Sequence, residues 1–195
     1  MADNARRSPL AGWTNELQAL GSAIHVQELP FLTQLNLRLD PSGPAADPVA
    51  KVLGVAIPTI PCTSVRSGLY EVLWLGPDEW LILAPPGSEA ELGTALREAI
   101  GPEHGAVTDV SAQRTAVQLS GPGARELLAK GCSIDLHPRV NPVGSCVQTL
   151  LAQTGIIIVA RDHTATDFLL LVRSSFAEYF AAWLVDASIE LTGSA

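Results

Sequence analysis

The chain has 195 residues, of which 47% are hydrophobic and only 16% are charged, which excludes a disordered tail and predicts one large or two small globular domains. Its 12 lysines and arginines against 20 aspartates and glutamates give a net charge of −8, so nucleic acid and anionic membranes have no electrostatic attraction to it. So few charges fit either a plain low-charge soluble domain or a surface that another chain partly covers.

The first half of the sequence predicts an arm followed by alternating strands and helices. Residues 1–22 have the composition of an extended or weakly helical arm. After the arm we expect strands over 24–30 and 35–39, a short helix over 47–54, a loop over 57–61, a hairpin of 69–75 with 79–84, a helix over 88–101 and a strand over 106–110. The clearest signals are Asp47-Pro48 at a helix start and a capping box from Ser88 to Glu91.

The second half repeats this order. We expect strands over 115–119, 145–152, 156–160 and 168–172, a helix from Pro122 to Gly131, and a last helix from a capping box at Ser175 that buries Phe176, Phe180, Trp183 and Leu184. Residues 78–83 and the capped helix after them resemble residues 166–171 and the capped helix that follows those. Chance similarity between two hairpin-and-helix units is the alternative to a duplication.

This order predicts the α+β class, with two ferredoxin-like split βαβ halves in which helices cover one face of each antiparallel sheet. We place the halves at residues 23–105 and 106–195, after the arm at 1–22, as one compact unit or two closely packed subdomains. The longest apolar runs, 156–160 and 168–172, have five residues each, far fewer than the ~20 that cross a bilayer. We therefore expect no membrane segment and a cytoplasmic location.

The residues contain no motif for catalysis or ligand binding. Cys62, Cys132 and Cys146 have no CxxC spacing, which predicts free thiols in a reducing cytosol. The four histidines have no ligand partner at metal-binding spacing. A GxSxG motif is absent, and the turn at 120–123 lacks the third glycine of a dinucleotide-binding loop. We therefore expect no catalytic, cofactor-binding or metal-binding residue in this chain.

A polar pair, Asp109 and Arg114, lies at the junction between two predicted strands. An arginine at this position has three possible roles, namely an ion pair with Asp109, contact with a carboxylate of a partner chain, or binding of a small anion. The residues alone leave these three roles open.

At this junction the sequence resembles the gamma subunit family of heterotetrameric sarcosine oxidase. The resemblance is carried by residues 109–122, 131–138 and 144–149, with further matches at 6–10, 75–81 and 172–176. Together these segments span nearly the whole chain. Residues 109–122 also match the wider folate-binding aminomethyltransferase family, so the resemblance implies an aminomethyltransferase-like fold.

The resemblance implies a complex of one alpha, one beta, one gamma and one delta subunit that oxidatively demethylates sarcosine to glycine, with folate as the one-carbon acceptor. It places FAD, FMN, NAD and folate in the large subunits, zinc in the delta subunit and no cofactor in the gamma chain. Folate enzymes of the wider family carry an acidic pair shortly after a Gly-Gly turn, and Ile158 and Val159 hold the corresponding positions here. Two aliphatic side chains cannot hydrogen-bond a pterin or an amine.

We therefore predict a non-catalytic gamma subunit that stabilises the flavin-bearing subunits. The alternatives are a stand-alone folate-dependent aminomethyltransferase-like enzyme and a small-molecule binding module. The candidate contacts with the alpha, beta or delta subunit come from the arm and from the junction: Arg6, Arg7, Trp13, Asp109, Gln113 and Arg114.

Overall fold

Two five-stranded antiparallel sheets form the frame of the molecule, which the computed structural model describes from residue 6 to residue 192. The strands are β1 (His25–Leu29), β2 (Thr33–Leu39), β3 (Ser64–Ser67), β4 (Tyr70–Gly76), β5 (Glu79–Ala84), β6 (Gly105–Asp109), β7 (Arg114–Ser120), β8 (Cys146–Leu151), β9 (Thr154–Ala160) and β10 (Asp167–Arg173). The helices are α1 (Thr14–Gln18), α2 (Ala46–Leu53), α3 (Glu89–Ile100), α4 (Ala124–Ala129) and α5 (Ala177–Thr192), with a 3-10 turn at Ser174–Phe176 before α5.

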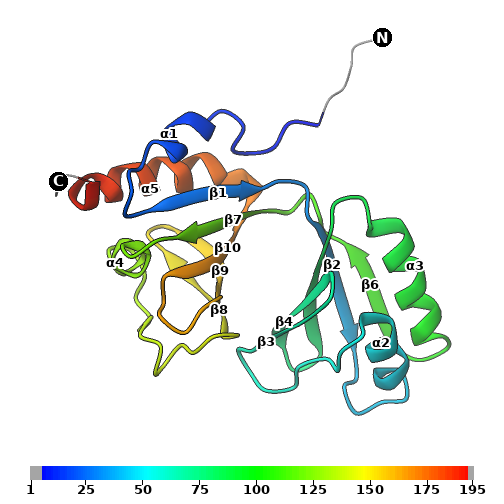
Figure 1. Ribbon diagram of the computed structural model, residues 1–195. Helices are drawn as coiled ribbons and strands as arrows, with labels where there is room; N and C mark the ends of the chain where they lie inside the picture. Colours follow the sequence, from blue (N-terminus) through cyan, green and yellow to red (C-terminus); the bar gives the residue numbers. More distant parts are fainter. Residues whose placement is uncertain (1–5, 193–195) are drawn as a thin grey trace, which may run out of the picture.

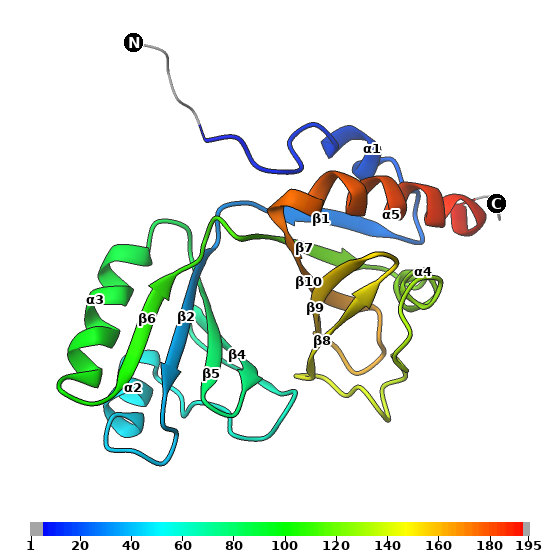
Figure 2. The ribbon, with the colours of Figure 1, turned by 180° about the vertical axis from the view of Figure 1, so that it is seen from behind.

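The helices cover the outer sides of the two sheets (Figures 1 and 2). One sheet, the β2 sheet, has the order β3-β4-β5-β2-β6, and its outer side packs on α2 and α3. The other, the β7 sheet, has the order β1-β7-β10-β9-β8, and its outer side packs on α1, α4 and α5. The inner sides face one another across a third apolar core. The predicted α+β class, with helices on one face of each antiparallel sheet, is confirmed.

The two sheets follow one plan, strand for strand. The orders β6-β2-β5-β4-β3 and β1-β7-β10-β9-β8 place equivalent strands in equivalent positions, and α2 and α3 correspond to α4 and α5. Trp80 on β5 pairs with Leu37 on β2. Its counterpart Phe168 on β10 pairs with Leu119 on β7, and both aromatic side chains are fully buried. This correspondence confirms the predicted pair of ferredoxin-like halves.

The fourth strand of each half comes from a different side of the chain. In the first half, β6 follows α3 and pairs with β2. Among the described residues no strand follows α5, and β1, from the N-terminal side, pairs with β7 instead. The sheets therefore divide the chain differently from the expected boundary between residues 105 and 106. The physical reason is that the edge of β7 needs a partner for its N–H and C=O groups, which β1 supplies.

Residues 6–22, expected as an extended or weakly helical arm, pack against the β7 sheet and contain the short helix α1. Leu10, Leu17 and Leu20 are at most 5% exposed, and the short helix α1 lies among them. They are buried because α1 lies against β1 and α5, where apolar surface is left to cover. Residues 1–5 of the expected arm lie outside the described residues.

Both predicted capping boxes mark a helix start, but neither forms the expected hydrogen bonds. Ser88 precedes α3 without a side-chain cap. Instead, the Ser88 backbone N–H donates to Thr33 Oγ1 (3.1 Å), and the Thr33 hydroxyl donates to Glu89 (3.0 Å), so β2 replaces the local cap. Ser175 lies in the 3-10 turn before α5. Phe176, which was expected in the core, is 43% exposed.

Candidate functional site

The two connections between the sheets meet at one junction, where β1 continues into β2 and β6 continues into β7. The backbone N–H of Val110 donates to the Gln34 carbonyl (2.9 Å), and the Gln34 side-chain amide donates to the Arg114 carbonyl (2.7 Å). The backbone N–H of Ser174, which follows β10, donates to the Gln113 carbonyl (2.9 Å). These bonds tie both connections and the end of β10 into one braced surface.

The N-terminal segment brings Arg6 and Arg7 to the same junction. The guanidinium carbon of Arg6 lies 4.9 Å from the centre of the Phe31 ring, a cation–π contact with the β1–β2 connection. Arg6, Arg7 and Arg114 line one cavity of about 260 Å³, together with Phe31 and Ser111. The structure thus joins two segments that are distant in the sequence, and that we had singled out separately, in one surface.

Asp109 and Arg114 do not form an ion pair, which was one of the three open roles. Ser111 donates to Asp109 Oδ1 through its backbone N–H (2.9 Å) and through its hydroxyl (2.5 Å). These hydrogen bonds, aided by the charge of Arg6, lower the pKa of Asp109. Arg114 donates instead to the side-chain oxygen of the adjacent Gln113. The roles left for Arg114 are those that need a carboxylate or anion from outside the chain.

A second arginine stands beside Arg114. Arg173 pairs directly with it across β7 and β10. Burial and the charge of Arg173 lower the pKa of Arg114, whereas the Glu79 carboxylate on the facing sheet raises it. Sequence reasoning missed Arg173, because the end of an apolar strand carries no signal of which residue lies opposite it.

Trp13, the remaining predicted contact residue, lies apart from this junction. Its side chain is partly buried against the core of the β7 sheet, and its backbone N–H donates to the Leu10 carbonyl (2.8 Å) in the turn before α1. It does not line the cavity of Arg6, Arg7 and Arg114. In the structure it packs the N-terminal segment onto the sheet.

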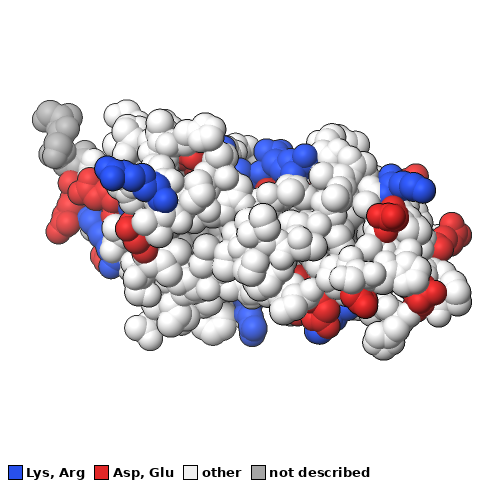
Figure 3. Space-filling model, turned by 90° about the horizontal axis from the view of Figure 1, so that it is seen from below, with Lys and Arg blue, Asp and Glu red and all other residues white. Residues whose placement is uncertain are grey.

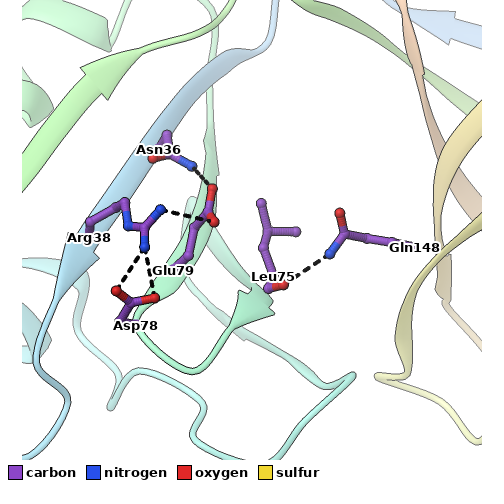
Figure 4. A network of polar contacts seen from close by, with 6 residues as sticks. All are labelled: Asn36, Arg38, Leu75, Asp78, Glu79 and Gln148. Carbon is purple, nitrogen blue, oxygen red and sulfur yellow. Dashed lines mark hydrogen bonds and ion pairs between the residues drawn. The ribbon is translucent and has the colours of Figure 1, made fainter.

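Figure 4 shows a polar network on the β2 sheet, whose members bind one another: Asn36, Arg38, Asp78 and Glu79. Arg38 donates to both carboxylate oxygens of Asp78, at 2.9 and 2.8 Å, which holds the turn between β4 and β5 against β2. Beside the network, Gln148 reaches from β8 and donates to the Leu75 carbonyl on β4 (3.0 Å). Because these groups satisfy one another, the network is structural, and the separate Gln148–Leu75 hydrogen bond links the two sheets.

A buried ion pair lies deeper between the sheets. Glu71 on β4 pairs with Arg161, which follows β9, at 2.7 Å, and the side chains are 6% and 15% exposed. Burial raises the pKa of Glu71 against the opposing charges of Arg161 and Arg66. Burial, with Glu71 and Cys62 nearby, raises the pKa of the Cys146 thiol to about 12. Cys146 is therefore a neutral packing thiol, and the predicted free cysteines are confirmed.

The positions that carry acids in folate enzymes are apolar and buried in this fold. Ile158 lies in the core between the β7 sheet and its helices, and Val159 in the core between the sheets, with at most 1% of each exposed. Neither side chain reaches a surface where a ligand could lie. Over residues 6–192, no group of three or more His, Cys, Asp or Glu side chains could hold a metal ion. Within the same residues, no helix has the length and apolarity to cross a membrane.

One face of the molecule carries little charge. Seen from below, its charged side chains lie mainly around the edge, at the two ends and in groups along the long sides, and much of the centre is uncharged (Figure 3). Two of the most exposed large apolar residues, Ile60 and Val140, are 69% and 66% exposed and lie on the loops before β3 and β8. These loops meet where the Ser64 backbone N–H donates to the Gly144 carbonyl (2.7 Å). Both residues thus lie on loops that contact each other where the two sheets meet.

Comparison with known proteins places this fold in a family. The pattern of the "Sarcosine oxidase, gamma subunit family" matches residues 38–190. The chain belongs to this family. It is 38% identical over 193 residues to sarcosine oxidase subunit gamma of Corynebacterium sp. (strain P-1), covering 96% of this chain and 92% of the relative. It is also 38% identical over 191 residues to sarcosine oxidase subunit gamma of Arthrobacter sp., covering 95% of this chain and 91% of the relative.

Two solved structures extend the comparison. A chain of the heterotetrameric sarcosine oxidase from Corynebacterium sp. U-96, in complex with pyrrole 2-carboxylate, is similar with a TM-score of 0.88 and 34% identity, over 97% of this chain and 98% of that chain. Aminomethyltransferase T of the glycine cleavage system from Bartonella henselae is similar with a TM-score of 0.63 and 14% identity, over 89% of this chain and 48% of that chain. The second likeness concerns the fold alone and agrees with the expected aminomethyltransferase-like architecture.

Proposed function

We propose that this chain is the gamma subunit of a heterotetrameric sarcosine oxidase, and that it stabilises the flavin-bearing subunits without catalysing a step itself. Burial of Ile158 and Val159, where a folate enzyme of this fold needs acids, carries the non-catalytic part of the proposal. Membership of the gamma subunit family supports the assembly part. By binding the folded large subunits and not their unfolded forms, the chain shifts them toward the flavin-holding state.

The partners in this proposal are an alpha, a beta and a delta subunit. We assign FAD, FMN, NAD and folate to the large subunits and zinc to the delta subunit, with no cofactor in this chain, and we place the complex in the cytoplasm. The complex oxidatively demethylates sarcosine to glycine, with folate as the one-carbon acceptor. The similar chain of known structure comes from a heterotetrameric sarcosine oxidase, which supports an assembly of this kind.

The junction surface is the part of the chain that we propose for contact with partners. It contains Arg6, Arg7, Asp109, Gln113 and Arg114, all exposed or half-buried. No ion pair involves these arginines within residues 6–192, so their charge is available to another chain. Trp13 is the remaining proposed contact; it lies apart from this surface, on the N-terminal segment.

The test is co-expression of this chain, carrying an affinity tag, with the alpha, beta and delta subunits. We expect a yellow, flavin-containing large subunit to co-purify with it. When the chain is omitted, we expect the remaining subunits to lose flavin and to melt at a lower temperature. The isolated chain is expected to show no absorbance beyond the protein band.

Two results with the isolated chain would contradict the proposal. One is oxidation of sarcosine by the purified chain, or a stoichiometric chromophore in it. The other is a saturable rise in melting temperature when tetrahydrofolate is added, which would favour a folate-dependent enzyme.

A further inference from the structure

Arg114 and Arg173 form a like-charge pair that the chain itself leaves unbalanced. They stand directly opposite each other on β7 and β10, an arrangement that costs stability because the two charges repel. Elsewhere Arg38 and Arg161 are paired with acids at 2.8 and 2.7 Å. Within residues 6–192, no carboxylate lies within ion-pair distance of Arg114 or Arg173. An anion from outside the chain, bound between the two arginines, would reduce this repulsion.

The two arginines line a cavity that is open above Gly155. Its volume is about 290 Å³, and its lining includes Gln148, Thr149 and Gly155 besides the arginines. A Cβ atom built at Gly155 would meet nothing within 4 Å. The two arginines therefore border a space that an incoming side chain can enter, together with the polar residues Gln148 and Thr149.

The internal acid whose charge acts on Arg114 is already engaged. Glu79 on the facing sheet accepts a hydrogen bond from Asn36 (2.7 Å) and pairs with Arg38 (3.5 Å). The Glu79 carboxylate raises the pKa of Arg114 from the facing sheet, but the two side chains do not form an ion pair. Glu79 therefore contributes negative charge near Arg114 but forms no ion pair with either arginine, and among the described residues Arg114 has only the neutral Gln113 amide as a side-chain partner.

More positive charge lies on the other side of Arg114. Arg114 also borders the neighbouring cavity of Arg6 and Arg7. The junction thus holds Arg6, Arg7, Arg114 and Arg173, out of 12 basic residues in a chain of net charge −8. Such a local concentration of positive charge attracts and orients an acidic surface on another protein.

From this geometry we propose that Arg114 and Arg173 are a receptor for a carboxylate side chain of a partner subunit, which enters over Gly155. A guanidinium offers a planar set of donors that matches a carboxylate. A solvent-accessible ion pair of this kind is too weak to retain a free small carboxylate. A carboxylate on an already docked subunit has a high effective concentration, so a weak ion pair is enough to hold it between the arginines. The inference rests on the proposed role as a subunit of a complex.

The first experiment turns the receptor into a cross-linking site. In the co-expressed complex, Arg173→Lys places an amine where the guanidinium was, and a water-soluble carbodiimide joins an amine to a touching carboxylate. The amide bond forms with loss of water, which the carbodiimide takes up as a urea. We expect mass spectrometry to find Lys at position 173 linked to an Asp or Glu of another subunit. Arg125→Lys, an exposed position on α4, is the matched control and is expected to give no such link.

The second experiment measures association. Arg173→Gln and Gly155→Leu are expected to weaken binding to the rest of the complex roughly tenfold, the first by removing charge and the second by filling the cavity with both arginines intact. Arg125→Gln is expected to bind as the unchanged chain does. Arg173 is exposed and Gly155 faces open space, so both variants are expected to fold, and their melting temperatures check this.

The outcomes separate this inference from the proposed function. If the unchanged chain fails to co-purify with any flavin-containing subunit, the proposed function fails. If it co-purifies, but the lysine at position 173 links only to Glu79 of the same chain or to nothing, the receptor is wrong and the proposed function stands. Binding of Gly155→Leu with unchanged affinity would also overturn the receptor.

Discussion

The two halves of the molecule share one strand order but complete their sheets differently. The β2 sheet is complete within residues 33–109, because β6 follows α3 and returns to β2. The β7 sheet takes its outer strand, β1, from residues 25–29, ahead of the entire first half. A repeated unit therefore does not make two separable domains, because one exchanged strand ties the second half to the beginning of the chain.

The two halves share one hydrogen bond between an amide and a carboxylate but differ in the charged groups beside it. Asn36 donates to Glu79 at 2.7 Å, and in the equivalent place Gln118 donates to Asp167 at 3.1 Å. Only the first of these carboxylates also has an ion pair, with Arg38. The amide–carboxylate contact therefore occurs in both halves, whereas the ion pair with Arg38 occurs in the first half alone.

The largest expected effect comes from deleting residues 1–29, which removes β1 and the apolar side chains that pack with it. These are Leu10, Leu17, Leu20, Ile24 and Val26. Burial of such side chains is worth about 1.5–3 kcal/mol each, so we expect a loss of roughly 7–15 kcal/mol, comparable to the whole stability of a domain. Hydrogen exchange with mass spectrometry is expected to show the β7 sheet unprotected and residues 33–109 still protected. Equal protection of both sheets would show that β1 is dispensable.

The equivalent aromatic residues give the next largest effect. Trp80→Ala and Phe168→Ala each empty a fully buried position, and we expect a loss of about 3–5 kcal/mol in the free energy of unfolding. Trp80→Ala is expected to cost more, because its indole N–H donates to the Pro58 carbonyl at 2.7 Å. Urea unfolding measures both, and Phe176→Ala, at a position that is 43% exposed, is the control with a small expected effect. A cost below about 1 kcal/mol for Phe168→Ala would remove the equivalence of the two positions.

The ion pair between the halves yields a prediction that depends on pH. Arg161→Leu leaves Glu71 buried without its partner, and we expect a loss of about 3–5 kcal/mol at neutral pH. The pKa of Glu71 is already raised from 4.5, and the variant raises it further. A carboxyl with a raised folded pKa stabilises the fold while protonated, and this contribution is lost as pH rises from the unfolded pKa through the folded one.

Denaturation of Arg161→Leu is therefore expected to show a smaller loss near pH 4 than at pH 7. The double variant Glu71→Met with Arg161→Leu is expected to recover most of the stability and to lose the pH dependence. An equal loss at both pH values would mean that Glu71 is not the titrating group.

The smallest expected effect concerns the shared amide–carboxylate contact. Asn36→Ala and Gln118→Ala each remove one charge-assisted hydrogen bond at a half-buried position, and we expect a loss of about 1.5–3 kcal/mol from each. Thermal unfolding of the two variants side by side measures the difference. Two losses that differ by more than about 1 kcal/mol would show that the halves do not use this contact equally.

Much of the secondary structure could be predicted because its signals are local. The helix expected over 47–54 is α2, which ends at Gly54 with a φ of 68°, a conformation that favours glycine. The strand β3 was missed, because Val65 is its only apolar residue. The choice of β1 or β6 as the closing strand of each sheet could not be predicted, since both are short strands and their pairing is decided by distant partners.

The candidate site was predictable in its parts but not in its assembly. Resemblance and charge singled out Arg6, Arg7 and Arg114, and the structure places them around one cavity. Their contact with a partner subunit stays a prediction. Trp13 was grouped with them by its place in the sequence, yet it packs elsewhere. The role of Arg173 could not be predicted, because its position opposite Arg114 depends on the register of β10 against β7.

The strand exchange sets the order in which a newly made chain can fold. His25 pairs with Ser120, so β1 leaves the ribosome 95 residues before its partner, a delay of roughly 5–20 seconds at ordinary rates of translation. Residues 33–109 can complete their own sheet during that interval, while β1 keeps its hydrogen-bonding groups and apolar side chains uncovered. Nascent chains are thus exposed to premature association through the unpaired β1, and recombinant yield is expected to depend on chaperones that bind this strand.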